Sequence, residues 1–503
     1  MKNILEYLEQ TEKKFGNKIA VADDSDELTF SQLKCRAQRI GTRVGKLGEK
    51  NAPIAVLLDK TPNCAAAFLG VVYSGNFYVV IDSFMPVDRI NKIFETLQPK
   101  GLITDHSHEQ KAEELKFPGE RILLEEALET EADMELLKGI RRRSIDTDPL
   151  YALFTSGSTG MPKGTVISHR AVIAYSEWVE TTFHIDENTV FGSQTPFYFS
   201  MSVTDFYSML RTGARLQIIP KQLFSFPLQL IEYMNRYRIN TIYWVPSALG
   251  LVANWKALDY GELEYVKTIL FAGEVMPVRH LNYWRKKLPD AFYANLFGPT
   301  ETTDICTYYV VDREFQDEDS LPIGNACNNC DVLVLTEEGK EARVGEEGEL
   351  CVRGSFLAEG YYNNPEKTAE VFTQNPLNPA YPERIYRTGD LVKYNDRGEL
   401  IYISRKDFQI KHMGYRIELG EIEASAWGVD KIKNCACVFD EAADKIIFIY
   451  EGKVKKNELM AVMWKKIPTY MQPNELIRVK SMPYNANGKI DRVYLKKNYK
   501  SYL

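Results

Sequence analysis

The segment Leu150-Tyr-Ala-Leu-Phe154 is followed directly by Thr155-Ser-Gly-Ser-Thr-Gly-Met-Pro-Lys-Gly164. The first part is an apolar stretch of strand length, and the second is a loop of glycines, hydroxyl residues and one lysine. Glycine lets the backbone approach an anion closely, and hydroxyls, backbone N–H groups and Lys163 suit phosphate oxygens. The spacing is not that of a Walker A loop. Taken alone, the loop has a second interpretation, a flexible connection.

Outward from this loop, apolar strands alternate with helical stretches over the first two-thirds of the chain. This alternation predicts parallel sheets with crossover helices. From about Cys330 the pattern changes to short strands separated by glycine-containing turns, which predicts an antiparallel β-rich subdomain. Beyond residue 407 we expect a small α+β unit. The strands of the first part are expected at 53–58, 77–81, 150–154, 216–219, 241–245 and 268–272.

Composition excludes several classes of protein. The 503 residues are enough for two or more domains, and 45% hydrophobic with 26% charged residues is typical of globular proteins. The net charge of -7 provides no basic field for nucleic acid. The start of the chain is charged throughout, and Ser74, Gly75 and Asn76 interrupt the most apolar stretch, so we expect neither a signal peptide nor a membrane span. A cytoplasmic location is therefore expected.

The eight cysteines are expected to be reduced thiols. Cys327 and Cys330 form a CxxC pair, and Cys435 and Cys437 form a CxC pair. Zinc needs four well-placed ligands, and neither pair has a second pair nearby in sequence. Metal binding and ordinary strand and loop cysteines both remain open, and the second interpretation is favoured.

Five further motifs follow the loop in a fixed order. They are Asn295-Leu-Phe-Gly-Pro-Thr-Glu-Thr302, Gly348-Glu-Leu-Cys-Val-Arg-Gly354, Tyr386-Arg-Thr-Gly-Asp390, Arg405-Lys-Asp-Phe-Gln-Ile-Lys-His-Met-Gly-Tyr-Arg-Ile-Glu418 and Asn485-Ala-Asn-Gly-Lys-Ile-Asp-Arg492. With the loop, they resemble the adenylate-forming superfamily over essentially the whole chain. This superfamily includes acyl-CoA synthetases, luciferases and the adenylation domains of nonribosomal peptide synthesis. Within it, the chain is similar to stand-alone adenylation enzymes such as D-alanine–D-alanyl carrier protein ligases.

The resemblance implies an α/β fold of two domains. Residues 1–405 would form an N-terminal domain of two parallel-type α/β sheets plus a β-barrel-like subdomain, which binds ATP and the acid. Residues 406–503 would form a small, mobile α+β domain that carries Lys489. Asp407 matches the hinge position, and Gly414 lies in the segment that would rotate to the tunnel for the incoming thiol. An ordinary loop aspartate is the alternative for Asp407.

The resemblance also assigns residues to ATP and Mg²⁺. Phe297 would stack on adenine, Asn295 would bond its edge and Asp390 would accept the ribose hydroxyls. Thr300 would lie at the α-phosphate, Glu301 would hold Mg²⁺, and Lys489 would bridge the substrate carboxylate and the nucleotide. Each of three residues also has an interpretation that needs no resemblance. Glu301 would then be a solvated carboxylate in a turn, Asp390 an aspartate of a β-turn, and Lys489 an exposed surface lysine. The remaining nucleotide residues implied are Thr155, Ser156, Gly157, Ser158, Thr159, Gly160, Lys163, Gly298 and Arg405.

The acid substrate is where the chain departs from its relatives. α-Amino-acid enzymes of the superfamily carry an aspartate that pairs with the substrate ammonium, and Ser200 stands at that position. A buried ammonium without a carboxylate is costly, so we hypothesise that Asp304 supplies one from another wall, for an amine displaced from the α-carbon or for a hydroxyl. The alternative is that Asp304 points to solvent or caps a turn. The resemblance places Phe199, Ser200, Met201, Thr204, Trp244, Leu270, Ala272, Leu296, Asp304 and Ile305 around this pocket.

The sequence therefore predicts a ligase that forms an acyl-adenylate from a small acid and passes the acyl group to a thiol. Because the sequence ends soon after Lys489, the thiol is expected in trans, on the phosphopantetheine of a separate carrier protein. An acyl- or aryl-CoA ligase and a D-alanine ligase proper are alternatives, although Ala272 departs from the cysteine associated with the latter. A degenerate homologue that only binds nucleotide is a more remote alternative.

Overall fold

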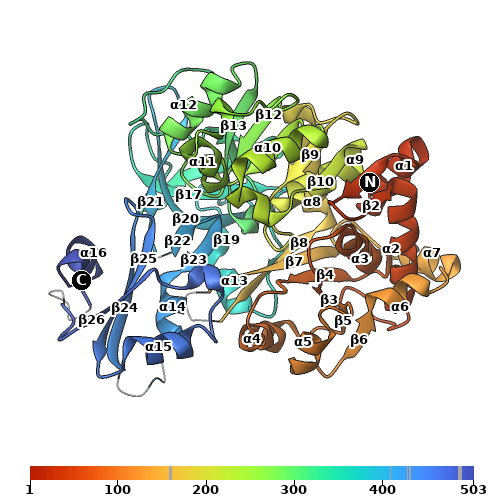
Figure 1. The fold of residues 1–503 in the computed structure, drawn as a ribbon, viewed down its shortest axis with the longest axis horizontal. Helices are drawn as coiled ribbons and strands as arrows, with labels where there is room; N and C mark the ends of the chain where they lie inside the picture. Colours follow the sequence, from red (N-terminus) through yellow and green to blue (C-terminus); the bar gives the residue numbers. More distant parts are fainter. Residues whose placement is uncertain (158–160, 408, 427–428, 430–431, 485–489, 503) are drawn as a thin grey trace.

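The structure is a computed structural model that describes residues 1–157, 161–407, 409–426, 429, 432–484 and 490–502. Figure 1 shows a large body that holds the N-terminus and a smaller body at the left that holds the C-terminus. Among the described residues, no helix combines the length and the apolar character needed to cross a membrane.

A mixed sheet crosses the larger body in the order β15-β14-β13-β12-β11-β9-β10-β1-β2. Its central strands pair in parallel, and β2, β14 and β15 pair antiparallel at the edges. The strands are β1 (Ile19–Ala22), β2 (Glu27–Thr29), β9 (Val190–Ser193), β10 (Arg215–Ile218), β11 (Thr241–Trp244), β12 (Thr268–Phe271), β13 (Phe292–Phe297), β14 (Thr307–Val310) and β15 (Asn325–Ala326). The helices between them are α8 (His169–Phe183), α9 (Ser202–Thr212), α10 (Pro227–Arg236), α11 (Pro246–Asn254) and α12 (Val278–Lys287).

A second sheet lies below the first in Figure 1 and runs β18-β8-β7-β4-β3-β5-β6. Its strands are β3 (Pro53–Leu57), β4 (Phe77–Ile81), β5 (Gly101–Thr104), β6 (Glu120–Leu123), β7 (Pro149–Thr155), β8 (Lys163–Ser168) and β18 (Gly360–Tyr361). Strands β3 to β7 pair in parallel, whereas β8 and β18 are antiparallel additions. The accompanying helices are α4 (Val87–Leu97), α5 (Glu109–Glu114), α6 (Leu124–Glu129), α7 (Met134–Arg142) and α13 (Pro365–Val371).

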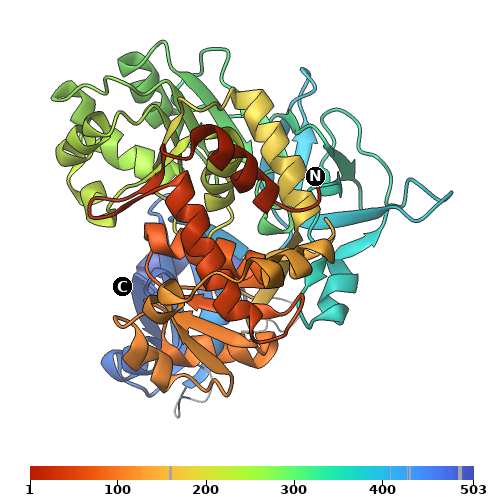
Figure 2. The same ribbon diagram turned by 90° about the vertical axis from the view of Figure 1, so that its right-hand side faces the viewer.

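Helix α3 (Pro62–Tyr73) joins the two sheets into one body. It is apolar all round apart from Asn63, and it contacts β1 of the first sheet as well as β3 and β4 of the second. Such a helix is stable only when it is buried on every side. Helices α1 (Leu5–Phe15) and α2 (Phe30–Gly45) pack beside it, and side chains of both sheets belong to one continuous core. In Figure 2, the red helices α1 and α2 face the viewer.

An antiparallel sheet follows in the chain, as the change of pattern near Cys330 predicts. Its strands run β16-β17-β20-β19, with β21 also pairing with β20. They are β16 (Cys330–Leu335), β17 (Gly348–Gly354), β19 (Phe372–Gln374), β20 (Arg384–Tyr394) and β21 (Leu400–Arg405). The α/β fold class predicted from the sequence is confirmed.

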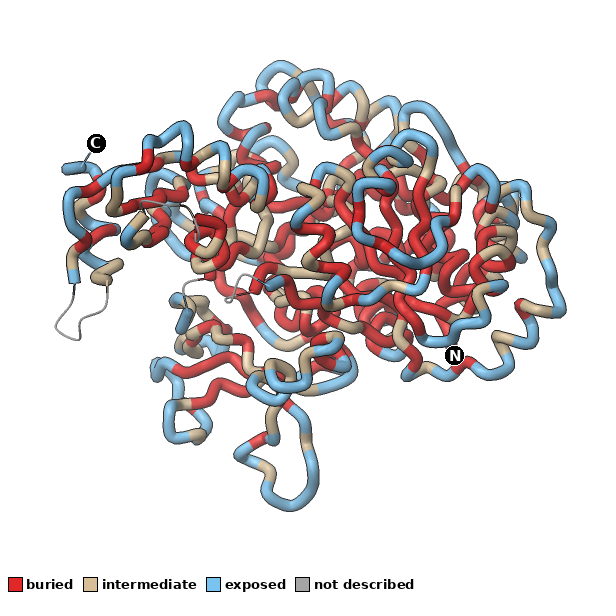
Figure 3. Tube along the Cα trace, turned by 90° about the horizontal axis from the view of Figure 1, so that it is seen from below, coloured by how far each residue is buried: buried red, intermediate tan, exposed pale blue. Residues whose placement is uncertain are grey.

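The smaller body has apolar cores of its own, separate from the core of the larger body, which extends to Tyr402. It contains β24 (Ile432–Asp440), β25 (Lys445–Gly452) and β26 (Glu475–Val479) with α14 (Leu419–Ser425), α15 (Lys456–Met463) and α16 (Arg492–Asn498). Figure 3 shows its buried trace set apart from that of the larger body. The boundary at 405/406 remains a prediction. The hairpin β22 (Gln409–His412) to β23 (Tyr415–Glu418) lies between the two bodies and contacts the larger one.

Candidate functional site

The predicted phosphate loop connects β7 to β8. Thr155 at the end of β7 pairs with Lys163 at the start of β8, so the loop is held between two antiparallel strands. At Gly157 a side chain would collide with the carbonyl oxygen of Met161, which explains the glycine. Ser158, Thr159 and Gly160 lie outside the described residues, as does Lys489.

The hydroxyl of Ser156 is bonded to hairpin β22–β23. Its Oγ donates to the carbonyl oxygen of Arg416 at 2.8 Å and accepts from the N–H of Glu418 at 3.2 Å. A hydroxyl has a single hydrogen to donate. In this arrangement that hydrogen is used within the protein.

Glu301 lies at the centre of the site and is fully buried. Its Oε1 accepts from the Tyr361 hydroxyl at 2.6 Å and lies 3.6 Å from Lys163 Nζ, and its Oε2 accepts from Arg416 Nη1 at 2.6 Å. Burial favours the neutral acid, but Arg416 and Lys163 outweigh it and hold the pKa of Glu301 well below its usual range. Burial, and next Arg416, lower the pKa of Lys163 to about 8.

A carboxylate is the ligand type that Mg²⁺ prefers, so the chemistry of Glu301 suits the predicted metal. Its surroundings do not, because the guanidinium of Arg416 and the ammonium of Lys163 lie 2.6 Å and 3.6 Å from its oxygens and would repel a metal ion. As arranged here, the residues do not fit a metal ion. Thr300 lies beside it on a short 3₁₀ turn and is partly exposed.

The residues predicted to hold the nucleoside lie along β13, β20 and β21. Asn295 donates to the Pro322 carbonyl at 2.8 Å, and the Lys411 ammonium lies 4.4 Å from the centroid of the Phe297 ring. Arg405 bonds Asp390 Oδ1 at 2.9 Å and both carboxylate oxygens of Asp407, the predicted hinge residue. Strand pairing opposes Asp390 and Arg405 directly. At Gly298 a side chain would collide with the backbone at 304–306, so only glycine permits the turn into Thr300.

Asp304 lies three residues after Glu301 and is also buried. The interpretation that it points to solvent is therefore wrong. Ser200 Oγ donates to Oδ1 at 2.9 Å, so Asp304 lies beside the position where the expected aspartate is missing. Three hydroxyls surround Oδ2, those of Tyr175 at 3.0 Å, Tyr243 at 3.0 Å and Thr204 at 3.2 Å.

Burial raises the pKa of Asp304 to about 6, although the four hydroxyls oppose the shift. The oxygen Oδ2 is surrounded by three hydroxyls, whereas Oδ1 has one donor, the partly exposed Ser200. A carboxylate oxygen accepts two hydrogen bonds readily. Oδ1 is therefore the oxygen with capacity left for a further donor.

Most of the other predicted pocket residues are buried, and Leu270 pairs with Tyr243, a partner of Asp304, across β12 and β11. Leu270, Ala272, Leu296 and Ile305 are buried, and Met201 lies next to Gly273. Trp244 is different, because successive residues of a strand point to opposite faces and Tyr243 faces Asp304. The Trp244 indole donates to the Gly192 carbonyl instead and packs on Phe224. Phe199 is in edge contact with the ring of Tyr415 on the hairpin.

Gly414 approaches the same region from the hairpin. Its N–H donates to Glu274 Oε1 at 2.6 Å, and Glu274 Oε2 accepts from Ser247 N at the start of α11. Gly414 has a φ of 79°, and an added Cβ would lie 2.7 Å from a methyl group of Val245. Glycine is required on both grounds.

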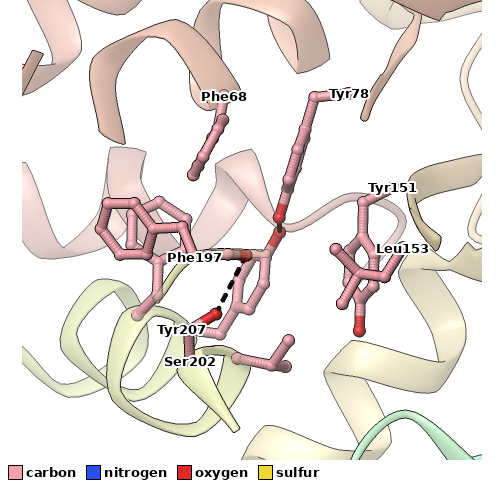
Figure 4. Close-up of a pocket in the computed structure, with 9 residues that line it drawn as sticks. Phe68, Tyr78, Tyr151, Leu153, Phe197, Ser202 and Tyr207 are labelled. Carbon is pink, nitrogen blue, oxygen red and sulfur yellow. Dashed lines mark hydrogen bonds between the residues drawn. The ribbon is translucent and has the colours of Figure 1, made fainter. Parts of the chain in front are cut away.

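A small aromatic-lined cavity lies elsewhere, between α3, β4, β7 and α9 (Figure 4). The Tyr78 and Tyr207 hydroxyls meet there at 2.7 Å, and the buried Tyr151 hydroxyl has no partner among the described residues. None of the predicted site residues lines it.

The cysteine pairs do not form a metal centre among the described residues, where no group of three or more His, Cys, Asp or Glu is arranged for a metal. Cys327, Cys330 and Cys437 are buried and Cys435 is partly buried. Burial raises the pKa of all four thiols, so they stay protonated at neutral pH.

Comparison with known proteins decides the family. The sequence model of a family described as AMP-binding enzyme matches residues 8–362. The chain belongs to this AMP-binding enzyme family. The predicted membership of the adenylate-forming superfamily is thereby confirmed.

Two relatives match this AMP-binding enzyme over nearly their full length. The L-proline--[L-prolyl-carrier protein] ligase of Streptomyces coelicolor is 33% identical over 93% of this chain and 91% of its own. The D-alanine--D-alanyl carrier protein ligase of Lacticaseibacillus casei is 29% identical over 97% of this chain and 98% of its own. Tyrocidine synthase 1 of Brevibacillus parabrevis is 29% identical over 98% of this chain, which is 44% of its own length. The chain spans less than half the length of the first curated relatives it matches.

The fold of the enzyme also matches solved structures. The adenylation domain AlmE of Vibrio cholerae, in complex with glycyl-adenosine-5'-phosphate, superposes with a TM-score of 0.85 at 19% identity. The alignment covers 100% of this chain and 98% of that one. At this identity the likeness shows the fold alone.

Sequence reasoning missed several functional candidates of this enzyme. Tyr175 and Tyr243 bring hydroxyls to Asp304 from α8 and β11, and Arg416 and Glu274 connect the hairpin to the larger body. A tyrosine inside an otherwise apolar stretch is a usable signal, because a buried hydroxyl needs a partner. Arg416 belongs to the motif from Arg405 to Glu418, but its partner Glu301 is 115 residues away, and the motif does not reveal that pairing.

Proposed function

We propose that the enzyme activates a small carboxylic acid with ATP and passes the acyl group to the phosphopantetheine thiol of a carrier protein. A carboxylate oxygen of the acid attacks the α-phosphorus of ATP, and pyrophosphate leaves. The thiolate then attacks the acyl carbonyl carbon, and AMP leaves. The two near-full-length relatives, both carrier protein ligases by name, support this proposal.

The observation that carries the proposal is the placement of two buried carboxylates. Glu301 lies beside Lys163, at the start of the strand after the phosphate loop, whereas Asp304 bonds Ser200, one of the residues predicted to surround the acid. The same short turn therefore provides a charged group toward the polyphosphate and a charged group toward the acid. Such an arrangement would hold the acid beside the phosphates, and acid activation needs the two reactants close together and oriented.

ATP is assigned to the wall that contains Asn295, Phe297 and Asp390, and Mg²⁺ to Glu301. When bound, Mg²⁺ would neutralise charge on the phosphates. Thr300 is assigned to the α-phosphate, and Lys489 to the substrate carboxylate. Asp407 serves as the hinge and Gly414 lines the path of the thiol. These assignments rest on the sequence resemblance.

The acid is expected to carry an amine or hydroxyl away from the α-carbon. Ser200 leaves the usual position without charge, and Asp304 Oδ1 lies 2.9 Å from the Ser200 hydroxyl. An ammonium or hydroxyl on the substrate would give Oδ1 its second hydrogen-bond donor. This hydrogen bond would offset part of the free energy lost when the carboxylate is buried. β-Amino acids are the first class to test.

The test is acid-dependent ATP–pyrophosphate exchange over D- and L-alanine, other α-amino acids, β-amino acids, hydroxybenzoates and short fatty acids. Exchange with a β-amino acid or a hydroxy acid supports the proposal, and the preferred acid is then offered with a holo carrier protein or with CoA. Exchange with no acid contradicts acid activation. Turnover with CoA alone at a rate equal to that with a carrier contradicts the assignment of the acceptor.

A further inference from the structure

The turn that joins Glu301 to Asp304 has a backbone conformation that is rare for its residue type. Thr303 has a φ of 68° and a ψ of -57°. The N–H of Asp304 donates to the carbonyl oxygen of Thr302 at 2.8 Å and closes a three-residue turn around Thr303. Together these features describe the strained form of the γ-turn. A β-branched residue keeps a positive φ only where its surroundings hold it there.

The backbone after strand β17 provides these surroundings. The hydroxyl of Thr303 donates to the carbonyl oxygen of Phe356 at 2.9 Å. Two residues further on, the N–H of Ala358 donates to the carbonyl oxygen of Glu301 at 2.8 Å. Thr303 is fully buried, so water cannot replace its bond to Phe356. One short segment therefore holds the turn at its centre and at Glu301.

Phe356 also supports the hydroxyls around Asp304. Its ring packs edge-on against the ring of Tyr175, with the two centroids 5.4 Å apart. The hydroxyl of Tyr175 lies 3.0 Å from Asp304 Oδ2. The carbonyl oxygen of Phe356 thus fixes the turn, and its ring packs on a side chain that bonds the carboxylate at the end of the turn.

The γ-turn separates two carboxylates that would otherwise lie side by side. Thr300–Thr302 form a 3₁₀ turn, and residues three apart in a 3₁₀ helix eclipse one another. Continuing that helix would bring Glu301 and Asp304 together, and two buried like charges repel. Instead, Glu301 faces Lys163 at 3.6 Å, and Asp304 accepts from Ser200 at 2.9 Å. The two carboxylates share no hydrogen-bond partner among the described residues.

We propose that Thr303 is a positioning residue that holds Glu301 and Asp304 in one fixed relative orientation, and that this orientation aligns the acid with the phosphates of ATP. The inference rests on the proposed function, in which Lys163 binds the phosphates and Asp304 binds the acid. Thr303 is assigned to neither ligand. A change at Thr303 therefore leaves each binding site intact and alters how the two bound reactants face each other, which slows a reaction that depends on their alignment.

The test separates binding from alignment. The kcat of acid-dependent ATP–pyrophosphate exchange is measured at saturating ATP and acid, with the acid of the panel that supports the fastest exchange. The dissociation constants of ATP alone and of that acid alone are measured by calorimetry on the whole chain. In Thr303→Gly the strain is relieved, because glycine adopts a positive φ freely, and the bond to Phe356 is lost. We expect kcat to fall about hundredfold and both dissociation constants to stay within about twofold of wild type.

Two further variants identify the part of Thr303 that matters. Thr303→Ser keeps the hydroxyl, so its kcat should stay within about threefold of wild type. Thr303→Val keeps the branched shape but cannot donate to Phe356, so its kcat should fall about tenfold. The matched control is Lys256→Gly, at an exposed residue of the larger body that also has a positive φ, of 48°. This control should behave as wild type.

The results distinguish failure of the inference from failure of the proposed function. An unchanged kcat in Thr303→Gly overturns the inference and leaves acid activation standing. A dissociation constant that rises about as much as kcat falls also overturns it, because Thr303 would then shape a binding site. If Thr303→Gly does not fold, Thr303→Val and Thr303→Ser decide, and equal kcat values in these two overturn the inference. Wild-type protein that exchanges with no acid overturns the proposed function, and the inference with it.

Discussion

Glu301 and Asp304 lie three residues apart and are both buried, yet the protein treats the two carboxylates in opposite ways. Glu301 is surrounded by cations, and its pKa is held low. Asp304 is surrounded by hydroxyls, and burial raises its pKa to about 6. The difference shows that burial alone does not set the charge of a carboxylate, because the identity of its partners decides the sign of the shift.

The origin of the partners differs as well. The hydroxyls at Asp304 come from α8, α9, β11 and the loop before α9, all in the larger body. The closest cation at Glu301 comes from the hairpin that precedes the smaller body. Asp304 is therefore part of a fixed wall, whereas the surroundings of Glu301 change if the hairpin moves.

The largest effect is expected for Lys489→Ala, which tests whether the C-terminal segment serves the two half-reactions through different residues. Loss of the positive charge at the reacting carboxylate should lower ATP–pyrophosphate exchange by about 10³. Thioester formation from a supplied acyl-adenylate should survive, because Arg416 and Gly414 remain. Exposed Lys480→Ala is the control. Equal loss of both steps would show that Lys489 is misassigned.

Glu301→Gln comes next and tests the carboxylate that is surrounded by cations. It leaves Arg416 and Lys163 without their buried anion, so we expect exchange activity to fall by about 10²–10³ and the hairpin to lose protection. Steady-state pyrophosphate exchange and hydrogen exchange measure the two effects. Glu337→Gln, at an exposed turn, is the matched control. Unchanged hairpin protection would mean that Arg416 docks for another reason.

Asp304→Asn tests the fixed carboxylate. A hydrogen bond to a charged group contributes about 1.5–3 kcal/mol, so kcat/KM for the preferred acid should fall by about ten- to hundredfold. The KM for ATP should hardly change, because none of the four partners of Asp304 is a residue predicted to bind ATP. If the KM for ATP rises as much as the KM for the acid, Asp304 does not act on the acid alone, and its proposed role no longer differs from that of Glu301.

The alternation of strands and helices predicted the fold well. The spacing of apolar residues and the length of each apolar stretch depend on which residues are buried locally, so both can be recognised in the sequence. The strand ahead of the phosphate loop, expected at 150–154, is β7, and the strands expected at 77–81 and 241–245 are β4 and β11. Residues in contact across long separations were beyond reach. Tyr175 meets Asp304 across 129 residues and Arg416 meets Glu301 across 115, and no local pattern marks such pairs.

A smaller effect is expected when the pH is changed, because pH sets the charge of Asp304. Because the pKa of Asp304 is raised to about 6, the side chain is ionised above about pH 6 and becomes protonated as the pH falls through that value. An acid that carries an amine should therefore bind well above pH 6, and its KM should rise by about tenfold for each unit below it. The comparison is the KM of the same acid with Asp304→Asn, which should not change over this range. A rise of similar size in the variant would assign the pH dependence to another group.

Tyr243→Phe should give the smallest effect. It removes one of the hydroxyls around Oδ2 and leaves Ser200 on Oδ1, the oxygen assigned to the substrate. Hydrogen bonds from the hydroxyls lower the pKa of Asp304, so loss of one should raise it further and move the pH midpoint of acid binding upward. Near pH 6 the KM for the acid should increase about threefold, and at pH 8 it should match wild type, because the carboxylate is ionised there in both proteins. Tyr308→Phe, at a partly exposed tyrosine of β14 outside this shell, provides the control. A loss of affinity that is the same at pH 6 and pH 8 would indicate that Tyr243 shapes the pocket rather than the charge of Asp304.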